Sequence, residues 1–175
     1  MIEEKIKSVI RDVPDFPKPG IVFKDITPIL LKPELCQEII DEMKNKIQDW
    51  NVDAIAGVES RGFIFGLPLS IALNVPFIMI RKKGKLPFHT VSHKYDLEYG
   101  SAEIEVHVDA IEKGQNIVVH DDLLATGGTA AATAELITKQ GGTVAGFSFL
   151  VELAFLKGNE KLLPYSKNIQ NLVSY

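Results

Sequence analysis

The sequence predicts an α/β fold in which a mainly parallel sheet is flanked by helices. Short apolar runs typical of buried strands alternate with helical segments from residue 53 onward. Such alternation favours parallel strands joined by crossover helices. The 175 residues suffice for one domain with a hydrophobic core, and no repeat or linker divides them. We therefore expect a single domain over residues 1–175.

The first part of the chain is expected to be irregular before one long helix. A short helix is predicted over Glu3–Asp12, and the prolines and glycine of Pro14–Gly20 predict a loop. Ile21–Ile26 has the character of a short extended segment. Pro33 suits the first turn of a helix. Its apolar face recurs every fourth residue, at Leu35, Ile39, Met43 and Ile47.

The later elements alternate in type, and the Gly141–Gly142 pair ends the last helix. The predicted strands are Asp53–Val58, Pro76–Arg81, Ala102–Val108, Asn116–His120 and Thr143–Val151. The predicted helices are Gly62–Leu73 and Gly128–Gln140. Because ligands bind at the carboxyl ends of parallel strands, residues just after Val58, Ile80 and Val119 are the first candidates for a site.

The strand Ala102–Val108 differs from the others because its apolar and polar residues alternate. Ile104, Val106 and Val108 would face one way, and Glu103, Glu105 and His107 the other. This pattern predicts a half-exposed strand at a sheet edge or in a hairpin.

Composition excludes several classes of protein. No apolar run approaches the ~20 residues that span a bilayer, so we expect no membrane partner. The net charge of −4 argues weakly against a nucleic-acid binder. The first residues lack the apolar stretch of a secretory signal. The single cysteine, Cys36, has no internal disulfide partner, which fits a reducing cytoplasm.

One basic stretch stands out in this acidic chain. Five lysines and arginines lie between Arg81 and Lys94 without an intervening acid, together with His89 and His93. Such a stretch can bind a small anion. From charge alone, a solvated loop is the plainer interpretation.

The strongest candidate site begins with an acid pair. The apolar strand that starts at Asn116 ends at two adjacent carboxylates, Asp121 and Asp122. Carboxylates suit the hydroxyl donors of a ribose. Helix capping is the plainer alternative, but it does not explain two acids at the end of a buried strand.

A glycine-containing turn follows the acid pair and precedes an alanine-rich helix. Gly127 and Gly128 allow the backbone to approach a ligand closely. The amides at a helix N-terminus bind phosphate, and Thr126 and Thr129 can add hydroxyl donors. A sugar with both a phosphate and free hydroxyls would satisfy the whole stretch. Neither a Walker motif nor a G-x-G-x-x-G turn is present.

Five segments in this order carry a resemblance to a known family. Val118–Thr129 resembles the phosphoribosyl pyrophosphate signature of type I phosphoribosyltransferases. The other segments are similar to those of the adenine phosphoribosyltransferase family: Asp15–Pro28 to its base-binding segment, Ser60–Gly66 to its pyrophosphate loop, Arg81–Pro87 to its basic segment and Tyr95–Gly100 to its mobile catalytic loop. The sequence departs from the family at Lys24, at Phe88 and His89, and at His120, where arginine, other residue types and valine are usual.

The resemblance implies a type I phosphoribosyltransferase fold, with residues 1–32 contributing a small base-binding hood. It implies transfer of a phosphoribosyl group to adenine, giving AMP and pyrophosphate, in a homodimer. It implies Mg²⁺ held mainly by substrate oxygens, with no protein metal site.

The same resemblance implies a role for each site residue. Asp121 and Asp122 would hold the ribose hydroxyls, and Ala125–Thr129 the 5′-phosphate. The residues implied to face the pyrophosphate are Ser60, Arg61, Arg81 and Lys85, with Arg81 coming from a neighbouring subunit. Those implied to contact adenine are Val22, Phe23, Lys24 and Leu123, of which the backbone of Val22–Lys24 reads the base edge. Glu98 would be the proton partner and Tyr99 would close over the site.

Plainer interpretations stand beside these roles. Taken singly, Phe23 and Leu123 are typical core residues, Arg61 a surface charge and Glu98 a loop acid. His107 and His120 are expected to be structural. Two other functions are a regulator that binds phosphoribosyl pyrophosphate without turnover, and a transferase for another base. The first would need a nucleic-acid-binding surface, and the Pro19–Pro28 segment argues against the second.

Overall fold

A sheet of seven strands forms the middle of the computed structural model, which describes residues 1–97 and 99–175. The strand order is β5-β6-β4-β3-β7-β8-β9. The parallel neighbours are β4 (Phe77–Lys82), β3 (Ala54–Val58), β7 (Asn116–Leu124), β8 (Thr143–Glu152) and β9 (Ile169–Ser174). The hairpin of β5 (Thr90–Asp96) and β6 (Ser101–His107) adds antiparallel strands beside β4. The predicted mainly parallel sheet is confirmed.

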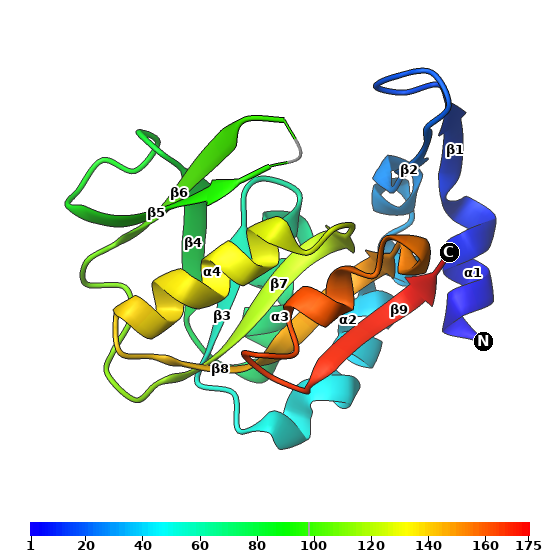
Figure 1. Ribbon diagram of the computed structural model, residues 1–175. Helices are drawn as coiled ribbons and strands as arrows, with labels where there is room; N and C mark the ends of the chain where they lie inside the picture. The colour runs from blue at the N-terminus through cyan, green and yellow to red at the C-terminus, as the bar shows by residue number, and fades with distance from the viewer. Residues whose placement is uncertain (98) are drawn as a thin grey trace.

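Helices cover both faces of this sheet (Figure 1). On one face lies α4 (Gly128–Lys139), and on the other lie α2 (Pro33–Ile47) and α3 (Gly62–Leu73). Val118 and Val119 of β7 are both fully buried but belong to opposite cores, because successive strand residues point to opposite faces. β7 is therefore buried on both sides, and its carboxyl end emerges between α3 and α4.

The N-terminal segment forms a separate small sheet. α1 (Ile2–Val9) leads into β1 (Arg11–Pro14), which pairs antiparallel with β2 (Val22–Asp25). α1 packs against β9, and the β1–β2 hairpin stands beyond the carboxyl ends of the parallel strands (Figure 1). Short 3₁₀ turns complete the chain: η1 (Thr27–Leu31), η2 (Gln48–Trp50), η3 (Ala154–Leu156) and η4 (Gly158–Lys161). In the described parts of the chain, no helix combines the length and apolar character needed to cross a membrane.

The first helix is shorter than the sequence predicts. The sequence predicts Glu3–Asp12, but the helix ends at Val9 and Arg11–Pro14 forms β1. The reason is a long-range pairing: Arg11 lies opposite Asp25, and Pro14 opposite Val22. Pairing with the later strand β2 overrides the local helical pattern, and such a long-range pairing cannot be seen in the local sequence.

The prediction of two distinct faces on β6 is wrong for Glu105. Ile104 and Val106 are buried as expected, but Glu105 is also only 2% exposed. Its carboxylate accepts the N–H groups of Lys85 (3.2 Å) and Leu86 (3.0 Å) and the Thr90 hydroxyl (3.2 Å). Burial alone would raise its pKa, but these hydrogen bonds lower it. Glu105 therefore holds the basic loop between β4 and β5 in place.

Candidate functional site

The site forms where β3 and β7 end side by side. These strands are parallel neighbours with Gly57 opposite His120, so the residues that follow each strand meet at one edge. Arg61, between β3 and α3, places its Nε 2.8 Å from Asp122 Oδ2. α3 starts close to β7, since a Cβ on Gly62 would lie 2.9 Å from the His120 carbonyl oxygen and 3.1 Å from Asp121 Oδ1. The predicted residues Arg61, Asp121 and Asp122 are brought together.

The two acids lie side by side, Asp122 buried and Asp121 half-buried. Asp122 is 4% exposed, and its N–H donates to Asp121 Oδ1 at 2.8 Å. Burial raises the pKa of Asp121 well above its usual value, and the charge of Asp122 raises it further. Burial also raises the pKa of Asp122, while Arg61 opposes that shift. Arg61 also lowers the pKa of Asp121, but its ion pair is with Asp122, so hydroxyl donors or a cation from a ligand would further stabilise the charged form of Asp121.

The glycine loop (Ala125–Thr129) turns the chain from β7 into α4. Gly127 has φ +81°, a left-handed conformation that glycine adopts without strain, and it forms the N-cap of α4. The first turn of α4 contains no acidic residue of its own, so its amide groups keep their partial positive charge toward the solvent side of the loop. A cavity of about 420 Å³ lies against this loop and is also lined by Asp121 and Leu123. The loop can therefore hold an anion beside a carboxylate.

A second cavity, of about 310 Å³, lies on the other side of the acid pair. Its lining residues are Glu59, Ser60, Arg61, Lys82, Asp121, Asp122 and Leu123. Asp121 and Leu123 line both cavities, so the two spaces meet at the acid pair. Lys82 and Arg61 place positive charge around the second cavity beside three carboxylates, of which Glu59 pairs with Arg81 and Asp122 with Arg61, so a second anion would meet cations here.

Neither Arg81 nor Lys85 is among the residues that line the second cavity. Arg81 Nε donates to Glu59 Oε2 at 3.1 Å, and Arg81 Nη1 donates to the Lys85 carbonyl oxygen at 3.2 Å. Burial opposes ionisation of Glu59, but the Lys82 N–H and Arg81 together lower its pKa. Of the basic run, Lys82 lines the second cavity, and the sequence analysis did not single it out as a site residue. Its membership of that run was the available signal.

The β1–β2 hairpin brings Phe23 to the site. The Arg61 guanidinium lies 5.2 Å from the centroid of the Phe23 ring. The Phe16 ring packs edge-on against the Phe23 ring, with 5.2 Å between their centroids. Because strand residues alternate, the next side chain points away. Lys24 Nζ lies 2.7 Å from Asp12 Oδ1 and 3.9 Å from the centroid of the Tyr175 ring. Phe23 thus faces the site, while the Lys24 side chain is held behind the hairpin.

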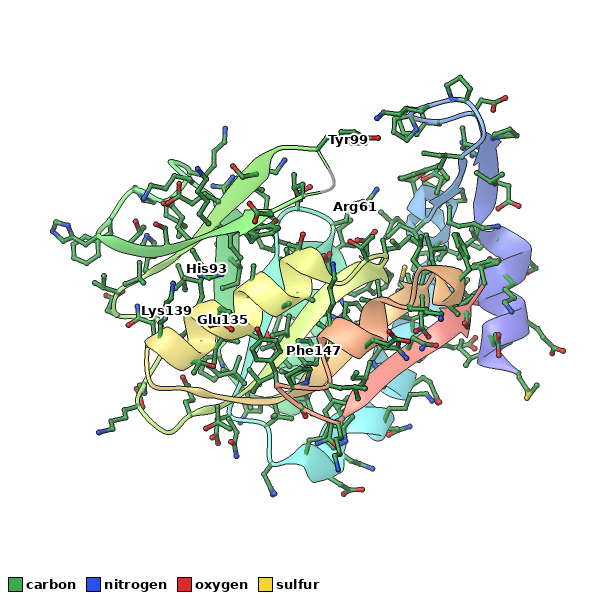
Figure 2. All side chains as sticks on the ribbon, viewed as in Figure 1. Arg61, His93, Tyr99, Glu135, Lys139 and Phe147 are labelled. Atoms are coloured by element: carbon green, nitrogen blue, oxygen red, sulfur yellow. The ribbon has the colours of Figure 1, made fainter. Side chains whose placement is uncertain are left out.

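Tyr99 lies on the turn between β5 and β6. Figure 2 shows it directed toward the tip of the β1–β2 hairpin, on the same side of the molecule as Arg61. Lys18 Nζ, from that hairpin, lies 5.3 Å from the centroid of the Tyr99 ring. The two segments therefore meet across the site. The predicted catalytic residue Glu98 lies outside the described residues.

His120 is structural, as expected. It is fully buried, and its Nδ1 lies 3.3 Å from Ser148 Oγ. Burial lowers its pKa to about 4, with Ser148 opposing the shift. The imidazole is therefore neutral at neutral pH and adds no charge beneath the acid pair.

The chain is similar throughout its length to known proteins. Residues 26–173 match the family model described as phosphoribosyl transferase domain. An adenine phosphoribosyltransferase from Cytophaga hutchinsonii is 52% identical over 100% of this chain and 97% of its own. The crystal structure of adenine phosphoribosyltransferase from Thermoanaerobacter pseudethanolicus has a TM-score of 0.95 and 46% identity, with 100% of both chains covered. That from Saccharomyces cerevisiae, complexed with an imino-altritol bisphosphate and adenine, has a TM-score of 0.90 and 38% identity, with 98% of both chains covered.

Proposed function

The chain belongs to the adenine phosphoribosyltransferase family, and we propose that its acid pair, glycine loop and Arg61 together transfer the phosphoribosyl group of phosphoribosyl pyrophosphate to adenine. The products are AMP and pyrophosphate, and the process is purine salvage. The observation that carries this assignment is the place where the two cavities meet at the acid pair. Asp121 lines both the cavity against a helix N-terminus and the cavity lined by Arg61 and Lys82, and Asp122 beside it lines the second. A ribose with an anion at each end matches that order of groups.

The sugar and its 5′-phosphate bind along the end of β7. Asp121 and Asp122 accept hydrogen bonds from the ribose hydroxyls. Burial opposes ionisation of both acids, so hydroxyl donors that reach them directly stabilise their charged forms. The 5′-phosphate binds the glycine loop, where backbone amides at the start of α4 and the hydroxyls of Thr126 and Thr129 are the donors. Thr129 Oγ1 lies 3.1 Å from the Tyr95 hydroxyl, which orients it.

Pyrophosphate occupies the cavity between the acid pair and β4. Ser60 and Arg61 come from the loop after β3, and Lys82 from the end of β4. These groups neutralise the leaving group as its charge develops. Lys85 also reaches pyrophosphate, and Arg81, which is held by Glu59 in its own chain, reaches the pyrophosphate of a neighbouring subunit.

A homodimer makes that sharing possible, and α3 offers the surface for it. This helix exposes Leu67 (47%) and Ile71 (69%), and Met79 of β4 is 42% exposed. Arg61 is the N-cap of α3, so a second copy packed on this face would lie beside the pyrophosphate cavity. Large exposed apolar side chains on one helix favour such a contact.

Adenine binds between Phe23 and Leu123, with its edge on the backbone of Val22–Lys24. In the described residues β2 pairs with β1 alone, so backbone groups along its other edge are available to a ligand. Residues 1–32 act as the hood of the single domain. Tyr99 closes over the site against Lys18, and Glu98 is the proton partner of the purine.

The reaction needs no protein nucleophile. The anomeric carbon becomes oxocarbenium-like as pyrophosphate departs, and adenine attacks from the opposite face. The chain binds the 5′-phosphate and the pyrophosphate of the sugar, orients the base and excludes water that would capture the cation. Arg61 contacts both Asp122 and Phe23, so it couples the sugar side of the site to the base side.

The residues present fit a Mg²⁺ ion that accompanies phosphoribosyl pyrophosphate. Carboxylate oxygens are ligands that Mg²⁺ prefers, and Asp121, whose ionisation is opposed by burial and by Asp122, would gain from a nearby divalent cation. When bound, the ion would neutralise pyrophosphate charge, and substrate oxygens would be its main ligands. Within residues 1–97 and 99–175, no three His, Cys, Asp or Glu side chains form a ligand group.

A reducing cytoplasm suits the half-buried Cys36, the one cysteine in the sequence.

A panel of purine bases tests the assigned activity. Adenine, hypoxanthine, guanine and xanthine are each incubated with phosphoribosyl pyrophosphate and Mg²⁺, and the nucleotides are separated by chromatography. AMP from adenine, with the other bases at least about 10⁴-fold less efficient, is the expected result. Comparable formation of IMP from hypoxanthine would contradict the preference for adenine. If no base gives a nucleotide, the assigned activity is wrong.

Lys24→Ala is expected to preserve the choice of adenine. The Lys24 ammonium is held by Asp12 and Tyr175, so the side chain does not face the base. The adenine-to-hypoxanthine ratio of kcat/KM should stay within about tenfold of wild type, or ~1.4 kcal/mol. Overall efficiency should fall modestly. A collapse of that ratio in a folded variant would show that the side chain carries specificity.

Mixing two inactive variants should restore activity if sites are shared. In an Arg81→Ala and Asp122→Ala heterodimer, one site carries both defects and the other carries neither, so up to half of the heterodimer sites should turn over. Arg61→Ala mixed with Asp122→Ala is the matched control. Arg61 and Asp122 pair within one chain, so every heterodimer site keeps one defect. No recovery in the first mixture, after subunit exchange is shown with tagged chains, would contradict sharing.

A further inference from the structure

The cavity against the glycine loop has one lining residue that comes from far along the chain. Lys161, at the end of η4, lines it together with Ala125–Thr129. Two acids, Asp96 and Asp121, also line this cavity. Of the described lining residues, Lys161 is the one with a cationic side chain. A phosphate here would therefore meet neutral amides and hydroxyls from the loop, and a full positive charge only from η4.

Backbone contact fixes the turn that carries Lys161. A Cβ on Gly127 would overlap the Gly158 carbonyl oxygen, and a Cβ on Gly158 would overlap the Ala125 carbonyl oxygen. The two glycines allow η4 and the glycine loop to pack backbone against backbone. The next residue after Lys161, Leu162, is fully buried in the core on the α4 side. The Lys161 backbone is thus anchored on both sides, while its side chain is exposed toward the cavity.

We propose that Lys161 is a further substrate-binding residue, whose ammonium contacts the 5′-phosphate held by the glycine loop. The inference rests on the proposed function and adds a residue to that site. Helix amides carry only partial charges, whereas a phosphate monoester is close to a dianion at neutral pH. An ammonium at this place offsets the negative charge of Asp121 and Asp96 and selects phosphorylated over unphosphorylated sugar.

The test compares AMP with adenosine by calorimetric titration, so it needs no turnover. Wild type should bind AMP more tightly than adenosine. Lys161→Gln should lower AMP affinity by about tenfold, leave adenosine affinity unchanged and flatten the salt dependence of AMP binding. Lys161→Arg should restore most of the AMP affinity. Lys167→Gln, which removes an exposed lysine away from the cavity, is the matched control and should change neither ligand.

Each other outcome overturns the proposal. If Lys161→Gln keeps the full preference for AMP, the ammonium does not contact the phosphate, and the proposed function still stands. If the variant loses affinity for AMP and for adenosine equally, Lys161 acts only through the fold. If wild type itself shows no preference for AMP, the proposed function fails, and the inference fails with it.

Discussion

Asp121→Asn and Asp122→Asn should each lower kcat/KM for phosphoribosyl pyrophosphate by about 10- to 150-fold, since a hydrogen bond to a charged group is worth ~1.5–3 kcal/mol. Asparagine keeps the shape of the side chain but removes the charged acceptor. The loss at Asp122 should be the larger, because Arg61 then loses its partner at 2.8 Å as well. Steady-state kinetics with the sugar substrate varied at saturating adenine measure both effects.

A matched control separates the acid pair from general damage to β7. Asp53 Oδ2 accepts the N–H of Asn116 at 2.8 Å, at the opposite end of the same strand. Asp53→Asn should leave KM for phosphoribosyl pyrophosphate unchanged. Wild-type kinetics in both folded acid-pair variants would contradict their role in holding the sugar.

Glu98→Gln should lower the single-turnover rate by about 10²–10⁴ while sugar-phosphate binding stays nearly intact. Glutamine keeps the shape of the side chain but cannot exchange the proton of the purine ring. Rapid quenching of enzyme in excess over substrate isolates the chemical step from product release. Glu112→Gln, in the loop before β7 at the far end of the sheet, is the control and should match wild type. A single-turnover rate equal to wild type in Glu98→Gln would leave Glu98 without a catalytic role.

The local parts of the site could be predicted from sequence because they are continuous. Asn116–Thr129 carries strand, acid pair, glycine turn and helix start in one stretch, and each follows from short-range rules. That Arg61 and Asp122 lie in one site followed less directly, from the expectation that ligands bind at the carboxyl ends of the strands, and their ion pair was not predicted.

The parts that sequence reasoning missed depend on contacts between distant segments. β1 exists because Arg11–Pro14 meets β2, and Glu105 is buried because the basic loop supplies its hydrogen bonds. Lys161 reaches the glycine loop only because Gly158 and Gly127 pack together. Nothing in the local pattern around any of these residues distinguishes it from a surface position.

Binding of AMP analogues that lack one hydroxyl tests the central claim, that the acid pair holds the ribose. Dissociation constants for AMP, 2′-deoxy-AMP and 3′-deoxy-AMP are measured by calorimetry on wild type, Asp121→Asn and Asp122→Asn. Wild type should bind at least one deoxy analogue about tenfold or more weakly than AMP. In one Asn variant that difference should shrink to within about twofold, because the carboxylate that accepts the missing hydroxyl has already been removed. Undiminished discrimination between AMP and its deoxy analogues in both Asn variants would contradict the claim.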